Sequence, residues 1–185
     1  MVCINYHQKE LTFKIVYYGA KGSGKSAHLN YLKKHFKSGV FSLIKDEAGN
    51  TIIDSLHISL GTVNQFHVKY HFYCVSGEKS LKDYRKQILK EADGVIFIAD
   101  SGSQKNAANI DSLKELLAHL TLENAQIPVV IQYNKRDLPL SMNLFEMEKE
   151  LNYIKTDSFE SNALDGTSVF ASLKTLSNKI ISNVA

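Results

Sequence analysis

Residues that could bind phosphate occur near the start of the chain, in the run Gly19-Ala20-Lys21-Gly22-Ser23-Gly24-Lys25-Ser26. The run fits the pattern G-x-x-x-x-G-K-[ST], in which glycines let the backbone wrap closely around a phosphate and direct N–H groups at it. Lys25 is placed to reach the outer phosphates of a nucleotide, and the Ser26 hydroxyl can ligate Mg²⁺. The alternative is a glycine-rich turn that arose by chance. The motif requires a strand before it and a helix after it, and the sequence predicts both.

A second run of chemical interest is Asn134-Lys135-Arg136-Asp137, which follows an apolar segment. The Asp137 carboxylate can accept two hydrogen bonds from the N1–H and exocyclic amine of guanine. Adenine lacks that donor pair and would leave the carboxylate unpaired, at a cost in free energy. The stem of Lys135 can lie across the purine face. Alone, the pattern could be a charged loop without a ligand, but together with the phosphate loop it predicts a guanine nucleotide.

The elements that must position these loops follow from the spacing of apolar residues. Apolar or β-branched runs predict strands at 13–18, 94–100 and 128–133 and a short strand at 157–160, and helical spacing predicts helices near 29–36, 81–89, 110–120, 144–151 and 169–184. Two alternating runs, 52–60 and 66–74, predict an antiparallel hairpin, and residues 37–50 before them are predicted to be irregular. Alternating strands and helices predict an α/β fold with a mainly parallel sheet covered on both faces. Ligands bind such sheets at the carboxyl ends of the strands.

Composition and charge narrow the function class further. A length of 185 residues, 44% hydrophobic and 22% charged, fits one globular domain over residues 1–185. The net charge of +3 is too mild to indicate a nucleic-acid binder. Cys3 and Cys74 have no metal-binding spacing, and two free thiols fit a reducing cytoplasm. No apolar run reaches the roughly 20 residues that span a bilayer, and neither end carries a lipidation motif, so we expect no direct membrane anchor.

The third motif is Glu160-Ser161-Asn162-Ala163-Leu164. With this run, three motifs occur in the order and spacing of the Ras-like small GTPases, and the chain resembles that family over its whole length. In the family the backbone N–H of the alanine meets guanine O6. Ala163 matches that position, and Leu164 stands where a lysine is frequent.

The Ras-like resemblance implies a P-loop NTPase fold with a mostly parallel six- or seven-stranded sheet, one antiparallel hairpin, and helices on both faces. It implies GTP or GDP and Mg²⁺ as ligands. The nucleotide-binding positions that it implies are Gly19, Lys21, Gly22, Ser23, Gly24, Lys25, Ser26, Ala27, Asn134, Lys135, Asp137, Ser161, Asn162 and Ala163.

A narrower resemblance rests on residues 15–19, 59–61, 93–95 and 130–139. These stretches are similar to the MglA group, bacterial Ras-like GTPases of gliding motility and cell polarity. The resemblance implies a switch that sets a cell pole and is recruited there, and not a metabolic enzyme. It also implies two kinds of partner: a roadblock-type homodimer that activates the GTPase, and polar or response-regulator-like effector proteins.

The chain departs from the Ras-like pattern after the hairpin, where D-x-x-G-Q is expected and Cys74-Val75-Ser76-Gly77-Glu78 is found. Gly77 is kept, so its N–H can meet a γ-phosphate. Cys74 replaces an aspartate that helps to hold Mg²⁺. Glu78 replaces the glutamine that orients the attacking water. A carboxylate about 4 Å from a phosphate charge is repelled by roughly 4 kcal/mol at an effective dielectric constant near 20. We therefore expect Glu78 to point away, to be protonated, or to leave the water unaligned.

The segment before the hairpin departs as well. The MglA group carries an arginine finger followed by a threonine for Mg²⁺, and Gly49 and Asn50 occupy those places here. Thr51, one residue later, could join Ser26 at the metal after a local shift. An arginine finger contributes about 10³–10⁵ in rate, so its absence matters. Lys21 stands where the phosphate loop usually has a small residue. It could add charge near the γ-phosphate, obstruct a catalytic group from a partner, or face solvent.

These substitutions predict a guanine-nucleotide switch whose GTP hydrolysis is slow or defective. The main alternative is a pseudo-GTPase scaffold that binds polar partner proteins whatever the nucleotide. A P-loop kinase or ATPase would share the phosphate loop alone, and residues 134–137 argue against it.

Overall fold

The computed structural model describes residues 3–36, 39–63, 65–122 and 126–183. Its strands are β1 (Cys3–Asn5), β2 (Glu10–Tyr18), β3 (Val40–Lys45), β4 (Thr51–Val63), β5 (Phe66–Val75), β6 (Gly94–Asp100), β7 (Val129–Asn134) and β8 (Ser158–Ser161). Its α-helices are α1 (Lys25–His35), α2 (Lys82–Leu89), α3 (Asn106–Leu122), α4 (Leu144–Leu151) and α5 (Val169–Ser182). Short 3₁₀ turns, η1 (Lys79–Leu81) and η2 (Ser103–Lys105), precede α2 and α3.

The strands form one sheet in the order β3-β4-β5-β2-β6-β7-β8, with β1 paired to β2 outside this path. The pairs β2–β5, β2–β6, β6–β7 and β7–β8 are parallel. The β4–β5 hairpin is antiparallel, as its alternating residues predicted. The expected mostly parallel sheet of the Ras-like fold is therefore confirmed. Its four parallel pairs bring the carboxyl ends of β2, β5, β6, β7 and β8 to a common edge.

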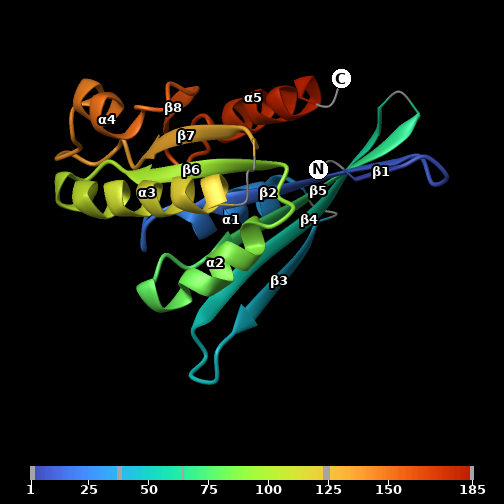
Figure 1. Ribbon diagram of the computed structural model, residues 1–185, viewed down its shortest axis with the longest axis horizontal. Helices are drawn as coiled ribbons and strands as arrows, with labels where there is room; N and C mark the ends of the chain where they lie inside the picture. The colour runs from blue at the N-terminus through green and yellow to red at the C-terminus, as the bar shows by residue number, and fades with distance from the viewer. Residues whose placement is uncertain (1–2, 37–38, 64, 123–125, 184–185) are drawn as a thin grey trace.

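Two apolar layers hold helices against opposite faces of the sheet. One layer packs α1 and α5 on alternate residues of β2, β4 and β5, including Ile15, Leu56 and Phe72. The other packs α2, α3 and α4 on the second face, around β6 and β7. All seven residues of β6 and all six of β7 are buried, as expected for central parallel strands covered on both sides. Figure 1 shows the central strands between these helices.

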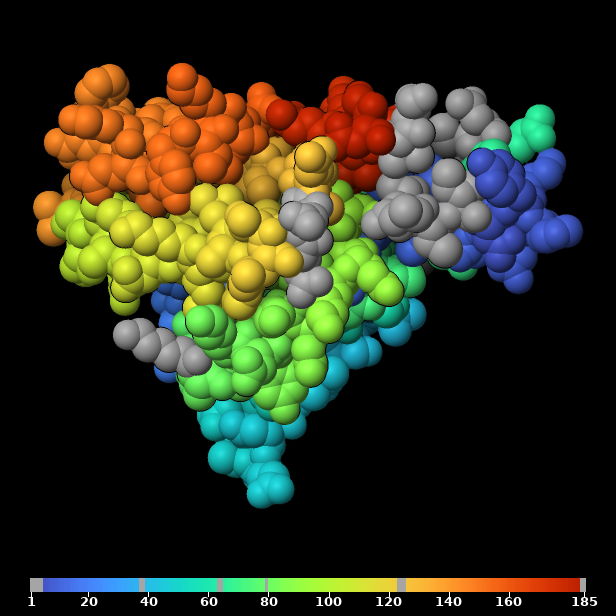
Figure 2. All heavy atoms as spheres, in the orientation of Figure 1, coloured from blue at the N-terminus to red at the C-terminus, as the bar shows by residue number. Residues whose placement is uncertain are grey.

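The expectation that residues 37–50 are irregular was wrong for its described part, since β3 pairs antiparallel with β4. Five of the six residues of β3 are exposed, so no alternation of apolar and polar residues marks the strand. Hydrogen bonds to β4 hold it at the sheet edge. Its turn to β4 projects from the body of the molecule (Figures 1 and 2). The three-residue β1 was also not predicted, and Val184, expected in the last helix, lies outside the described residues.

Within the described ranges, none of the helices has both the length and the apolar character required for crossing a membrane.

Candidate functional site

The phosphate loop, residues 19–26, connects the end of β2 to the start of α1, as predicted. Gly19 has φ 146°, and a Cβ atom there would lie 2.3 Å from the Ile98 carbonyl oxygen, so only glycine fits. The Lys25 ammonium donates to the carbonyl oxygens of Gly19 and Ala20, at 2.8 Å each. Burial lowers the pKa of Lys25. Its amine therefore lies folded over the loop, where carbonyl oxygens partly compensate for the lost hydration.

Asn134 joins the three sequence motifs. Its side-chain Nδ2 donates to the Ser23 carbonyl oxygen at 2.8 Å, and its Oδ1 accepts from the Ala163 backbone N–H at 3.0 Å. The side chain is buried, and so is Ser161 at the end of β8. One amide thus ties the phosphate loop to the loop after β8. The Ala163 N–H, expected to face guanine, donates to Asn134 in this arrangement.

Lys135 and Asp100 form a second polar contact, at the carboxyl ends of β6 and β7. The Lys135 ammonium lies 2.7 Å from Asp100 Oδ2, and the Gly102 N–H donates to Asp100 Oδ1 at 2.9 Å. Asp100 was not predicted as a site residue, although an acid at the end of an apolar strand is a usable signal. The Asp137 side chain is exposed at the same edge. Asn162 bonds within its own loop, with Nδ2 donating to Asp165 at 3.0 Å.

A cavity of about 240 Å³ opens beside the phosphate loop. Seven of the predicted positions line it: Gly22, Gly24, Lys25, Ser26, Ala27, Thr51 and Gly77. Asp54 and Cys74 complete much of its wall. Thr51, at the start of β4, thus lines the same cavity as Ser26.

Asp54 is the residue that sequence analysis missed in this cavity. It is buried on β4 and lies directly opposite Cys74 of β5 in the hairpin register. The signal was a lone acid in an apolar alternating segment. Burial raises the pKa of the Cys74 thiol to about 12, so it stays protonated, 3.9 Å from the Ser26 hydroxyl. Oxygen ligands suit Mg²⁺ and thiols do not. Ser26, Thr51 and Asp54 therefore fit a Mg²⁺ site, with the carboxylate on β4 in place of one at Cys74.

The segment 76–81 lies against the phosphate loop. A Cβ atom on Gly77 would lie 2.2 Å from the Lys21 backbone nitrogen and 2.4 Å from the Ala20 carbonyl carbon. Next to it, the Lys21 ammonium forms an ion pair with Glu78 Oε1 at 2.8 Å. Lys21, Gly77 and Glu78 line a second cavity, about 560 Å³, between this segment and α3.

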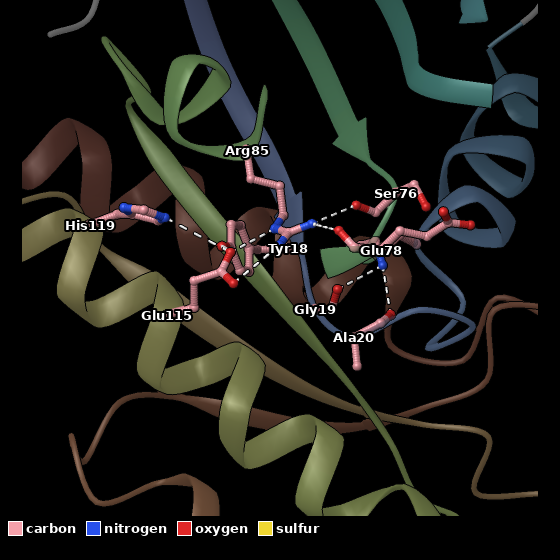
Figure 3. A network of polar contacts seen from close by, with 9 residues as sticks. Tyr18, Gly19, Ala20, Ser76, Glu78, Arg85, Glu115 and His119 are labelled. Carbon is pink, nitrogen blue, oxygen red and sulfur yellow. Dashed lines mark hydrogen bonds and ion pairs between the residues drawn. The ribbon is translucent and has the colours of Figure 1, made fainter. Parts of the chain in front are cut away.

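Arg85 of α2 anchors the same segment from the interior of the protein (Figure 3). Its Nη1 donates to the carbonyl oxygens of Ser76 and Glu78, at 2.9 and 2.6 Å. Its Nε and Nη2 pair with the Glu115 carboxylate of α3, at 2.7 and 3.1 Å, and Tyr18 donates to that carboxylate at 2.5 Å. Burial acts to raise the pKa of Glu115, but these hydrogen bonds outweigh it and the pKa is lowered. Arg85 was not predicted, because its partners are distant in sequence.

Gly49 and Asn50 form the turn between β3 and β4. The Asn50 N–H and side-chain Nδ2 donate to the Asp46 carboxylate, at 2.7 and 3.0 Å. Gly49 has φ 85°, in the region that favours glycine. The residues at the place of the arginine finger and its threonine thus have a local structural role in the turn.

Known proteins are similar to this chain in sequence. A model of the ADP-ribosylation factor family matches residues 2–180. The mutual gliding-motility protein MglA of Myxococcus xanthus (strain DK1622) is 37% identical over 191 residues, which cover 100% of this chain and 98% of that protein. The chain belongs to the ADP-ribosylation factor family of small GTPases. Within that family it belongs to the MglA group. The human ADP-ribosylation factor-like protein 4A is 32% identical over 142 residues, covering 76% of this chain and 66% of that protein.

This ADP-ribosylation factor family member gathers its predicted site residues in two places. The phosphate loop, Thr51 and Gly77 surround the first cavity. Asn134, Lys135 and residues 161–163 meet at the carboxyl ends of β7 and β8, joined to the phosphate loop through Asn134. Glu78 stays outside the first cavity, turned to Lys21.

Proposed function

We propose that this small GTPase is a single domain over residues 1–185 that binds GDP and GTP and acts as an MglA-type switch in bacterial cell polarity and motility. The observation that carries the proposal is the double hydrogen bond of Asn134 to Ser23 and Ala163, which sets the three motifs around one edge of the sheet. Ligands bind α/β sheets at that edge. In this proposal the phosphate loop holds the phosphates, Asp137 recognises guanine, and the Ala163 N–H exchanges Asn134 for guanine O6 when the nucleotide binds.

Asp137 provides the sharpest test of the base. Stripped protein would be titrated with fluorescent GDP, a non-hydrolysable GTP analogue and ATP, with and without Mg²⁺. We expect binding of the guanine nucleotides alone. Asp137→Asn should weaken GDP binding at least about 100-fold, because two hydrogen bonds to a charged acceptor are lost. Asp157→Asn, with a half-exposed side chain at the amino-terminal end of β8, is the matched control. Equal binding of ATP and GDP would contradict the proposal.

Mg²⁺ fits the oxygen atoms of Ser26, Thr51 and Asp54, and when bound it would neutralise phosphate charge. These residues would orient the ion, and the protonated Cys74 thiol would add no charge. Asp54→Asn should raise the Mg²⁺ concentration needed for half-maximal GDP retention about tenfold, equivalent to about 1.4 kcal/mol. Asp46→Asn, in the exposed β3–β4 turn, is the control. An unchanged Mg²⁺ requirement would remove Asp54 from the site.

GTP hydrolysis is proposed to be slow, because Glu78 replaces the water-orienting glutamine and Gly49 replaces the arginine finger. The proposed activator is a roadblock-type homodimer, and the proposed effectors are polar or response-regulator-like proteins, with recruitment to a cell pole. A single-turnover assay with a purified activator measures the rate. Rates typical of activated small GTPases would contradict slow hydrolysis.

A pseudo-GTPase scaffold is the second candidate, favoured by the ion pair that closes Glu78 onto Lys21. It predicts partner binding that GDP and the GTP analogue do not change, together with no measurable nucleotide affinity.

A further inference from the structure

Two unusual residues, one on the phosphate loop and one after Gly77, form a single contact. The Lys21 ammonium and the Glu78 carboxylate lie 2.8 Å apart, and their side chains are 72% and 43% exposed. The pair therefore connects the phosphate loop to the segment 76–81 at the outer edge of the site, where a third phosphate would add charge.

The backbone on both sides of this contact is fixed. Gly77 packs against the backbone of Ala20 and Lys21 so closely that no side chain fits between them. Arg85 holds the carbonyl oxygens of Ser76 and Glu78 from the interior. The ends of the Lys21 and Glu78 side chains are exposed, whereas the backbone that carries them is anchored. A rearrangement here can thus be confined to two side chains.

We propose that the ion pair between Lys21 and Glu78 distinguishes GTP from GDP by opening when a γ-phosphate is present. We call these two residues the exchange pair. With GDP, Lys21 stays on Glu78. With GTP, Lys21 leaves the carboxylate for the γ-phosphate, and the released Glu78 turns into the cavity beside α3. This inference rests on the proposed guanine-nucleotide site and names the residues by which that site distinguishes its two ligands.

The charges set the direction of the exchange. A γ-phosphate repels the Glu78 carboxylate and attracts the Lys21 ammonium. Both electrostatic forces favour opening of the ion pair. The cavity of about 560 Å³ that the pair lines has room for the carboxylate. Two cations, Lys105 and Arg85, and two carboxylates, Asp111 and Glu115, line the same cavity. Arg85 is already paired with Glu115, so Lys105 is the cation there that a released Glu78 can approach.

Glu78→Gln and Lys21→Ala should consequently change the ratio of GTP-analogue affinity to GDP affinity in opposite directions. Glu78→Gln frees Lys21 and removes the repulsion, so the ratio of GTP-analogue affinity to GDP affinity should rise about 3- to 5-fold, as for a half-exposed ion pair. Lys21→Ala removes the cation that the γ-phosphate attracts, so the ratio should fall by a similar factor. The double variant should return close to the wild-type ratio.

The experiment is a titration of the full chain with fluorescent GDP and a non-hydrolysable GTP analogue, at low and high salt. Screening should reduce both changes at high salt. Lys69→Ala and Glu10→Gln are the matched controls, because these residues form an ion pair of 2.6 Å at the other end of β2 and β5. Neither control should alter the ratio.

A variant with the two charges reversed tests whether the pair distinguishes GTP from GDP or only stabilises the fold. Lys21→Glu combined with Glu78→Lys can rebuild an ion pair but places a carboxylate on the phosphate loop. We expect the lowest ratio of the series. A wild-type ratio in this variant, or single variants that shift the ratio in the same direction, would overturn the exchange pair. Wild-type protein that binds neither guanine nucleotide would instead overturn the proposed function itself.

Discussion

The two sides of the candidate site differ in how their polar groups are held. On the side of β6 and β7, Asp100 and Asn134 are 3% and 2% exposed, and both are hydrogen-bonded to neighbouring loops. On the other side, Lys21 and Glu78 meet at the surface, and the β3–β4 turn projects into solvent (Figure 2). A buried polar group costs free energy when it loses its partner, whereas an exposed one exchanges that partner for water.

The difference explains where substitutions from the family pattern have gathered. The side of β6 and β7 has Asn134 and Lys135, whose removal would leave Ser23, Ala163 and Asp100 without partners, and its departure from the pattern, Leu164, is exposed. Cys74, Glu78 and Gly49 all lie on the side of the hairpin and the segment 76–81. That side combines the exposed contacts of Glu78 and the β3–β4 turn, which rearrange at low cost, with buried groups at Cys74, Asp54 and Arg85.

The largest expected effect tests the buried anchor at Arg85. Arg85→Ala should lower the free energy of unfolding by about 4 kcal/mol, because it leaves the Glu115 carboxylate without its buried cation. Urea denaturation measures the change, and Lys82→Ala, an exposed cation on the same helix, should alter it by less than about 0.5 kcal/mol. Equal effects of the two variants would mean that the hairpin side has no buried anchor.

His28 is buried on α1 behind the phosphate loop, and it tests the cost of burial through the pH dependence of stability. Its Nδ1–H donates to the Gly24 carbonyl oxygen at 2.9 Å, and burial lowers its pKa from 6.5 to about 4. The unfolded chain therefore binds this proton more readily than the folded chain. Stability should fall as pH drops from 6.5 to about 4, by about 3 kcal/mol from this group alone. Urea denaturation across this pH range should show a smaller loss for His28→Leu, while the exposed His35→Gln keeps the wild-type slope. Parallel curves for His28→Leu and wild type would contradict the assignment.

Asn134→Ala should have the next largest effect. Its removal leaves the Ser23 carbonyl and the Ala163 N–H without their partner, so the free energy of unfolding should fall by about 2 kcal/mol. Denaturant unfolding of the nucleotide-free protein separates this cost from any lost ligand. Asn178→Ala, exposed on α5, serves for comparison. A cost no larger than that of Asn178→Ala would make the two sides of the site equivalent.

The smallest effect is expected in the exposed turn. Gly49→Ala should cost about 1 kcal/mol, because φ is positive at Gly49 while no atom lies within 4 Å of the added Cβ. Thermal unfolding measures this change, with Ala48→Ser in the same turn as control. If Gly49→Ala lowered the free energy of unfolding more than Asn134→Ala does, the exposed side would be the less tolerant one, and the comparison between the two sides would be wrong.

Much of the fold was predictable because its signals are local. The hairpin of β4 and β5 was predicted from the alternation of apolar and polar residues along each strand. Strand β6 was predicted from an unbroken apolar run, which is typical of a strand buried on both faces of a sheet. The edge strand β3 was not predictable in this way. Its residues are mostly exposed, and only its hydrogen bonds to β4 define it.

The sequence by itself determined the three motifs and the order of the elements that carry them, since each depends on neighbours along the chain. Tertiary structure alone decided three contacts: Asp54 facing Cys74 across the hairpin, Arg85 reaching Glu115, and Lys21 pairing with Glu78. Each joins residues far apart in sequence. Their distances are fixed by strand register and by the packing of α2 against α3, and no local pattern encodes either.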